Sequence, residues 1–204
     1  MVKKALILLV MLGVHHSALA EFPMSNRTAK LGLDNVVSYD GATQFTLEGH
    51  GLNVGDAMPS MLLTTSTLDA FDTTKNQGKV RIYSVLTSVD TPVCIQQAQE
   101  LSEFIDDHPE LTKNIEFIAI SSDTPFAQQR FVELHDLDDE LIFVSDSRKH
   151  EFGYRTGSLI QELGLLSRSI IVVDQDNVVV YIQRVPELTT IPNLVRAVKV
   201  AKKV

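Results

Sequence analysis

The chain has 204 residues, of which 44% are apolar and 22% charged, and it carries 18 Lys and Arg against 26 Asp and Glu. This composition fits one globular domain with short extensions and excludes a disordered or low-complexity chain. The excess of acidic side chains argues against binding to nucleic acid or to an anionic membrane surface. A single cysteine, Cys94, excludes any disulfide within the chain.

The first 20 residues have the pattern of an export signal. Two lysines precede an apolar run at 5–14, and Ala18-Leu19-Ala20 forms a cleavage site. The run is shorter than the roughly 20 residues that cross a bilayer, so a membrane anchor or a buried helix is the less favoured interpretation. We therefore expect residues 1–20 to be a signal peptide and the protein to be exported, either to a periplasm or out of the cell.

Residues 21–42 show no sustained periodicity, so they are interpreted as an irregular N-terminal arm that precedes one domain over 43–204. Within that domain, strand-like and helix-like patterns alternate. The expected strands are 43–48, 79–87, 115–121, 141–145, 169–174 and 178–184. The expected helices are 92–107, 125–135, 148–155 and 192–203.

The order of these elements predicts the fold class. The loop at 174–177 is too short for a crossover helix, so the last two strands should be antiparallel. A β-α-β unit followed by β-β-α is typical of an α/β, thioredoxin-like fold. We expect a central mixed β-sheet flanked by helices, with a β-hairpin as an N-terminal extension and no internal repeat.

The one thiol falls where a strand leads into a helix. Thr91 suits the N-cap and Pro92 the first helical position, which puts Cys94 in the first turn. Backbone N–H groups there favour a thiolate, but a helix end supplies only about 0.3–1 kcal/mol, so a strongly reactive thiolate also needs a fixed cation or another donor. The Thr91 hydroxyl is one candidate donor. From the residues alone, both a reactive thiol and a buried, inert one remain open.

The residues around Cys94 carry a family resemblance. Thr91-Pro92-Val93-Cys94 has the form T-x-x-C, and residues 121–131 read Ser-Ser-Asp-Thr-Pro-Phe-Ala-Gln-Gln-Arg-Phe. From residue 43 to the C-terminus, the chain resembles the thiol peroxidase branch of the peroxiredoxin superfamily. The resemblance implies that Cys94 is the peroxidatic cysteine, Thr91 its hydroxyl partner, and Arg168 the guanidinium that steadies thiolate and peroxide. Without the resemblance, Arg168 would be read as a surface arginine.

Two positions depart from that family's pattern. Val132 stands where thiol peroxidases usually carry a resolving cysteine, and Thr87 stands where the signature has proline. The first departure indicates a one-cysteine variant whose Cys94 sulfenic acid is reduced by an external thiol, either a small molecule or a thioredoxin- or glutaredoxin-like protein. The resemblance also implies a homodimer.

No other motif points to a different chemistry. The histidines after residue 20 lack metal-ligand spacing, and no phosphate-binding, dinucleotide or serine-hydrolase motif occurs, so we expect no metal and no cofactor. The predicted function is an exported, thiol-dependent peroxidase that reduces hydrogen peroxide or organic hydroperoxides. The alternatives are a redox sensor or thiol relay on the same fold that does not turn over, and a structural domain with an unreactive thiol.

Overall fold

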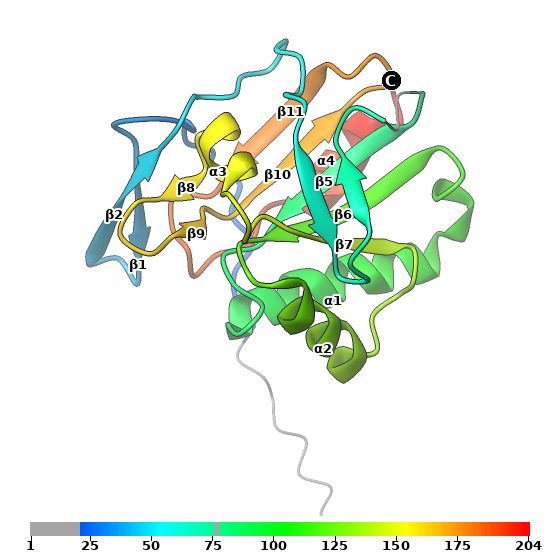
Figure 1. Ribbon diagram of the computed structural model, residues 1–204, viewed down its shortest axis with the longest axis horizontal. Helices are drawn as coiled ribbons and strands as arrows, with labels where there is room; N and C mark the ends of the chain where they lie inside the picture. The colour runs from blue at the N-terminus through cyan, green and yellow to red at the C-terminus, as the bar shows by residue number, and fades with distance from the viewer. Residues whose placement is uncertain (1–20, 76–77) are drawn as a thin grey trace, which may run out of the picture.

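A mixed sheet of seven strands, in the order β11-β10-β5-β6-β7-β3-β4, runs through the molecule (Figure 1). The computed structural model describes residues 21–75 and 78–204, so the predicted signal peptide lies outside the described residues. The strands of this sheet are β3 (Leu62–Thr65), β4 (Ala70–Asp72), β5 (Val80–Val85), β6 (Ile115–Ser121), β7 (Leu141–Ser145), β10 (Ser169–Val173) and β11 (Val179–Arg184).

The three central strands β5, β6 and β7 are parallel, and the outer strands pair antiparallel. Every residue of β5 is buried. A strand that is buried along its whole length has both faces covered, which is typical of parallel strands in α/β proteins.

Helices cover the two faces of the sheet unequally. Three of them, α1 (Pro92–Asp107), α2 (Pro125–His135) and α4 (Leu194–Ala201), pack against one hydrophobic cluster, and the short η1 (Pro109–Leu111) follows α1. α1 contributes Ala98, Leu101 and Ile105, whose spacing of three and four residues forms one apolar stripe. On the other face, α3 (Glu151–Thr156) buries Phe152 in a second cluster.

A smaller antiparallel sheet, in the order β1-β2-β8-β9, covers part of that second face. It consists of β1 (Val36–Tyr39), β2 (Thr43–Glu48), β8 (Leu159–Ile160) and β9 (Leu165–Leu166). β1 and β2 form an N-terminal hairpin, and Asp40 and Gly41 both have positive φ in its turn. β1 corrects the prediction that residues 21–42 are irregular throughout, because a strand of four residues is too short to show periodicity and is stabilised by its pairing with β2.

The rest of the arm, residues 21–35, has no helix and no regular strand, as predicted. It is nevertheless held against the domain by long-range backbone hydrogen bonds: Ala29 N–H donates to Arg184 O at 3.0 Å, and Ser25 N–H donates to Ile191 O at 2.8 Å. In Figure 1 this blue segment reaches the start of α1, which lies on the helical side of the sheet.

Helix starts explain most differences from the predicted bounds. The helix expected at 148–155 begins at Glu151, because His150 has φ of 53° and cannot be part of the helix. The helix expected at 192–203 begins at Leu194, because the Asn193 side chain accepts from Arg196 N–H and caps it. Among the described residues, no helix is long and apolar enough to cross a membrane.

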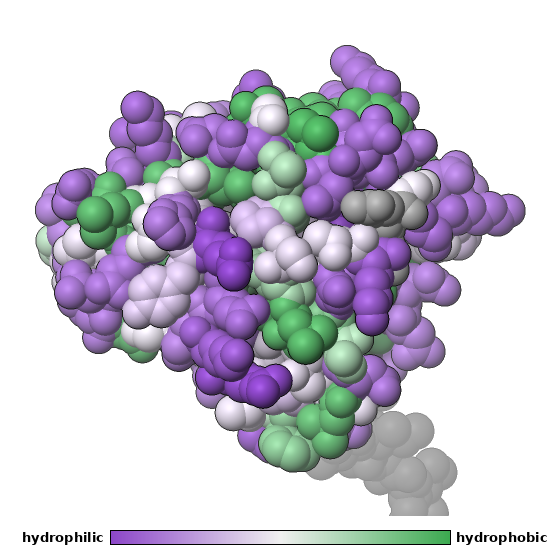
Figure 2. Space-filling model, turned by 45° about the horizontal axis from the view of Figure 1, so that its top comes forward, coloured by the Kyte–Doolittle hydropathy of each residue, from purple (hydrophilic) through white to green (hydrophobic). Residues whose placement is uncertain are grey.

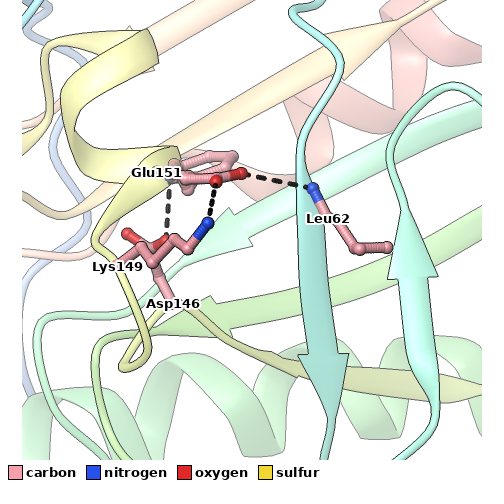
Figure 3. A network of polar contacts seen from close by, with 5 residues as sticks. Leu62, Asp146, Lys149 and Glu151 are labelled. Atoms are coloured by element: carbon pink, nitrogen blue, oxygen red, sulfur yellow. Dashed lines mark hydrogen bonds and ion pairs between the residues drawn. The ribbon is translucent and has the colours of Figure 1, made fainter.

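The N-terminus of α3 is held by carboxylates that tie it to the sheet (Figure 3). Asp146, at the end of β7, accepts hydrogen bonds of 2.9 Å from the N–H groups of Phe152 and Gly153. Glu151 accepts from Leu62 N–H at 3.4 Å and forms an ion pair of 3.7 Å with Lys149. These contacts link β7, α3 and the neighbouring strand β3.

Candidate active site

Cys94 is the third residue of α1, at the carboxyl end of β5, where open α/β sheets hold ligands. Its side chain is fully buried. The N–H group of Ser88 points at the sulfur, with an N–Sγ distance of 3.4 Å. The sequence placed the thiol correctly at the helix start, but this amide donor comes from the preceding loop and not from the first turn of the helix.

Arg168 reaches the same sulfur from a distant part of the chain. It precedes β10, whose Ser169 pairs with Val85 at the end of β5, so the sheet brings Arg168 next to the cysteine loop. Its Nη1 donates to Cys94 Sγ at 3.2 Å. The structure thus brings Arg168 into contact with Cys94, as the resemblance implies, and buries it, whereas the residues alone predicted a surface arginine.

Arg168 is buried, and none of its hydrogen bonds in the described structure goes to a carboxylate. The side chain is 1% exposed, and its other hydrogen bonds run to Gln97 Oε1 at 2.7 Å and to Leu188 O at 3.2 Å. Both of these acceptors are neutral. Since buried charges in proteins are normally paired, the thiolate form of Cys94 is the natural counter-charge within this group of contacts.

Thr91 takes the N-cap position, as predicted, but its hydroxyl makes no capping bond to α1. The hydroxyl donates to Ser88 O at 3.1 Å and so closes the turn that carries the Ser88 amide. No hydrogen bond joins it to Cys94 in the described structure. Thr91 also borders the cavity beside the thiol, so it lies where a substrate oxygen would approach.

Asp123 is a site residue to which the sequence alone assigned no role. Its two carboxylate oxygens accept from Ser88 Oγ at 2.9 Å and from Val89 N–H at 2.8 Å. Asp123 follows β6, the parallel neighbour of β5, and its own carbonyl accepts from Ser145 Oγ at 2.6 Å. The carboxyl ends of adjacent parallel strands meet at one edge of a sheet, and this rule could have indicated the contact.

Gln97 is the second missed residue. It lies one turn after Cys94 on α1, is 6% exposed, and uses its amide nitrogen to bind Ser84 Oγ at 2.8 Å while its oxygen accepts from Arg168. Its spacing of three residues from the cysteine puts both on one helical face, which was the available signal.

A cavity of about 440 Å³ opens next to these groups. The polar and charged residues of its wall are Thr87, Asp90, Thr91, Arg168 and Thr189. The remaining wall is apolar and is formed by Phe22, Tyr39, Phe45, Pro92, Val93, Leu163, Leu165 and Leu188. The cavity wall thus combines the active-site guanidinium with a mainly apolar lining.

Thr87 and Val132, the two residues that depart from the family pattern, are both in contact with the interior of the domain. Thr87 is 6% exposed, and its hydroxyl has no hydrogen-bond partner. Val132 lies within the continuous helix α2 and packs against the hydrophobic cluster of that face. Neither position offers a second sulfur, so oxidation of Cys94 cannot lead to an internal disulfide.

No group of three or more metal-ligating side chains is found in the part of the chain that the structure describes. Around Cys94, the groups that face the sulfur are the Arg168 guanidinium and the Ser88 N–H group.

Comparison with known proteins identifies the class. A family model for redoxins matches residues 53–198, and the chain belongs to this family, within the peroxiredoxin superfamily. The structure resembles that of a peroxiredoxin-like protein from Aquifex aeolicus, with a TM-score of 0.75 and 28% identity, over 84% of this chain and 98% of that one. The predicted thioredoxin-like fold is thereby confirmed.

Two relatives that are similar in sequence identify the branch of the superfamily to which the chain belongs. The chain is 36% identical over 159 residues to a thiol peroxidase of Bacillus subtilis, which covers 77% of this chain and 91% of the relative. It is 35% identical over 150 residues to a thiol peroxidase of Clostridium acetobutylicum, covering 74% and 88%. The protein is a thiol-dependent peroxidase of the thiol peroxidase branch.

Proposed function

We propose that this protein is an exported, one-cysteine peroxidase that reduces hydrogen peroxide or organic hydroperoxides through Cys94. The observation that carries the proposal is the 3.2 Å contact between Arg168 Nη1 and Cys94 Sγ, made by two buried side chains. The Ser88 N–H group adds a second donor to the sulfur. Both contacts favour the anionic, nucleophilic form of the thiol.

In the first half-reaction, the Cys94 thiolate attacks one oxygen of the peroxide, and the O–O bond breaks. The electron pair of that bond goes to the leaving oxygen, which takes up a proton and departs as water or an alcohol. The attacked oxygen stays on sulfur as a sulfenic acid. Arg168 stabilises the negative charge that shifts from sulfur to the leaving oxygen, and the Thr91 hydroxyl orients the peroxide.

In the second half-reaction, an external thiol attacks the Cys94 sulfur, releases water and forms a mixed disulfide. A second thiol then displaces the reduced Cys94, so two thiols supply the two electrons that the peroxide consumed. The external thiol is required because the sequence holds no other cysteine. We propose either a small thiol or a thioredoxin- or glutaredoxin-like protein as the reductant.

The cavity supports organic hydroperoxides as substrates alongside hydrogen peroxide. The polar groups of its wall can bind the O–O group, and its apolar wall residues can pack against an organic substituent. The face shown in Figure 2 is mainly hydrophilic, with hydrophobic side chains in separate small groups.

Export and self-association are further parts of the proposal. The pattern at residues 1–20 supports export to a periplasm or beyond, and the family resemblance supports a homodimer. Phe126 is 58% exposed on α2 and is available for a subunit contact, whereas Phe131 is buried in the core. Export is tested by the intact mass of the protein recovered outside the cytoplasm, which should be that of a chain beginning at Glu21. Analytical sedimentation tests the dimer.

A redox sensor or thiol relay is the second candidate, and the single, fully buried sulfur favours it. Such a protein would oxidise once and pass the oxidation to a partner without repeated turnover. Steady-state peroxide consumption with small thiols and with a thioredoxin separates the two, since repeated turnover occurs only in the enzyme.

The decisive experiment follows Cys94 by intact mass after mixing with a peroxide. We expect a gain of one oxygen at a rate far above that of free cysteine at the same pH. Oxidation no faster than that of free cysteine would refute the peroxidase mechanism and favour an inert structural thiol.

A further inference from the structure

The N-terminal arm contributes a side chain to the active-site cavity. Phe22 is partly buried and lies in the cavity wall together with Thr91, Pro92 and Arg168. The family match begins at residue 53, so this contribution comes from a segment outside the matched region. A feature of this chain that lies beyond the shared domain therefore shapes the space beside the thiol.

A single side chain fixes the backbone of Phe22. The amide oxygen of Gln96 accepts from Phe22 N–H at 2.7 Å, and the Gln96 nitrogen donates to Phe22 O at 3.1 Å. Gln96 lies on α1 two residues after Cys94, so the paired hydrogen bonds connect the arm directly to the catalytic helix. Both backbone polar groups of Phe22 are satisfied there, which fixes the residue in place.

The next residues of the arm hold it from the other side. Ile191 N–H donates to Pro23 O at 3.1 Å, and Gln183 Nε2 donates to Ser25 O at 2.6 Å. The backbone on both sides of Phe22 is thus held by contacts to α1, to β11 and to the loop after β11.

We propose that Phe22 is a specificity-determining residue of the peroxidase, and that the arm makes the cavity selective for hydroperoxides with a bulky apolar substituent. This rests on the proposed peroxidase function of Cys94. Hydrogen peroxide has only two heavy atoms and needs only the polar groups beside Cys94, so it gains nothing from the ring. An aromatic or long-chain hydroperoxide also fills the apolar space of the cavity and packs against Phe22.

The test compares two substrates in one protein. Rate constants for Cys94 oxidation are measured by rapid mixing with cumene hydroperoxide and with hydrogen peroxide, for the wild type and for Phe22→Ala and Phe22→Leu. We expect Phe22→Ala to lower the rate constant for cumene hydroperoxide about tenfold and to change that for hydrogen peroxide less than about twofold. Phe22→Leu, which keeps apolar volume, should fall between the two.

A second variant changes the anchor and leaves the ring intact. Gln96→Leu removes both hydrogen bonds to the Phe22 backbone and should give the same selective loss with cumene hydroperoxide. Met24→Ala is the matched control, because Met24 is an exposed arm residue outside the cavity wall and should leave both rates unchanged.

Each outcome decides a different point. Equal losses with both peroxides, or no loss with either, would overturn the role of Phe22 while leaving the peroxidase intact. Wild-type oxidation no faster than that of free cysteine with both peroxides would overturn the peroxidase mechanism, and the role of Phe22 with it.

Discussion

The Gln97 side chain and the Cys94 sulfur accept hydrogen bonds from the same nitrogen, Nη1 of Arg168, at 2.7 and 3.2 Å. Gln97 is itself fixed by Ser84 Oγ at 2.8 Å. A neutral amide therefore orients the guanidinium without neutralising it, so the positive charge stays available to the sulfur.

This arrangement predicts the effect of Gln97→Glu. The new carboxylate would pair with Arg168 and add negative charge beside the sulfur, and both effects disfavour the thiolate. We expect alkylation of Cys94 by iodoacetamide at neutral pH to slow about tenfold. Gln99→Glu, with the same charge change elsewhere on α1, serves as the control. An unchanged alkylation rate for Gln97→Glu would contradict this role of the neutral amide.

Replacement of Arg168 should remove the largest electrostatic contribution to the reaction. We expect Arg168→Met to lower the rate constant for oxidation of Cys94 by hydrogen peroxide about 100-fold, because it loses a donor aimed at the shifting charge. Arg168→Lys keeps the charge but not the geometry and should recover part of the loss. Arg130→Met, which alters an exposed arginine on α2, should react like the wild type. Circular dichroism checks that each variant is folded.

Asp123 acts on the sulfur through the loop that it holds. Asp123→Ala frees Ser88 and Val89, so the Ser88 N–H group loses its fixed direction toward Cys94. We expect oxidation of Cys94 to slow about tenfold, a cost in the range of a lost hydrogen bond to a charged group.

The control for Asp123 separates position from charge. Asp90→Ala removes an exposed carboxylate near the same cavity, and it should leave the rate unchanged or raise it, because less negative charge surrounds the thiolate. A rise in rate for Asp123→Ala as well would mean that its charge matters more than its hold on the loop.

The sequence predicted those parts of the structure that depend on local patterns. The helix at 92–107 and the strand at 115–121 have the predicted bounds, because Pro92 marks the start of the helix and a mainly apolar run, interrupted by Glu116, marks the strand. β8 and β9 were missed because strands of two residues carry no periodicity and exist only through pairing with β2 and with each other.

The same distinction applies to the active site. Cys94 was found from its place at a helix start, a local feature. Its contact with Arg168 joins residues 74 positions apart and was predicted only from family resemblance. The contacts of Asp123 and Gln97 depend on the direction of single side chains across strands and helices, which composition and spacing do not determine.

Thr87 offers a prediction about stability. Its hydroxyl is buried without a partner, which costs roughly 1–3 kcal/mol in general. Thr87→Val keeps the shape and removes the polar group, so we expect the free energy of unfolding in urea to rise by about 1 kcal/mol. Thr91→Val removes a hydroxyl that is hydrogen-bonded to Ser88 O and should instead lower it. A lower free energy of unfolding for Thr87→Val would show that the Thr87 hydroxyl has a hydrogen-bond partner in solution.

Asp146 predicts a pH dependence of stability. Burial raises the pKa of its carboxyl from 3.8 to about 6, against the lowering effect of the Gly153 and Phe152 N–H groups. The folded state therefore holds this proton more tightly than the unfolded state does. The stabilisation of the folded state by the protonated Asp146 carboxyl is complete below about pH 4 and is lost as pH rises through about 6.

The measurement is urea unfolding of the wild type and of Asp146→Asn between pH 4 and pH 7. The free energy of unfolding of the wild type, relative to that of Asp146→Asn, should fall by on the order of 3 kcal/mol across this range. A difference that does not vary with pH would contradict the raised pKa.

Val132 leaves α2 as an unbroken helix with no sulfur to present. Reduction of the oxidised cysteine therefore requires no unwinding of this helix. In the proposed mechanism the reducing molecule reaches the buried Cys94 from outside, and the cavity of about 440 Å³ that Thr91 and Arg168 line is one route to it. The width of this cavity then selects reductants as well as oxidants by size, which favours a small thiol over a protein that presents a broad surface.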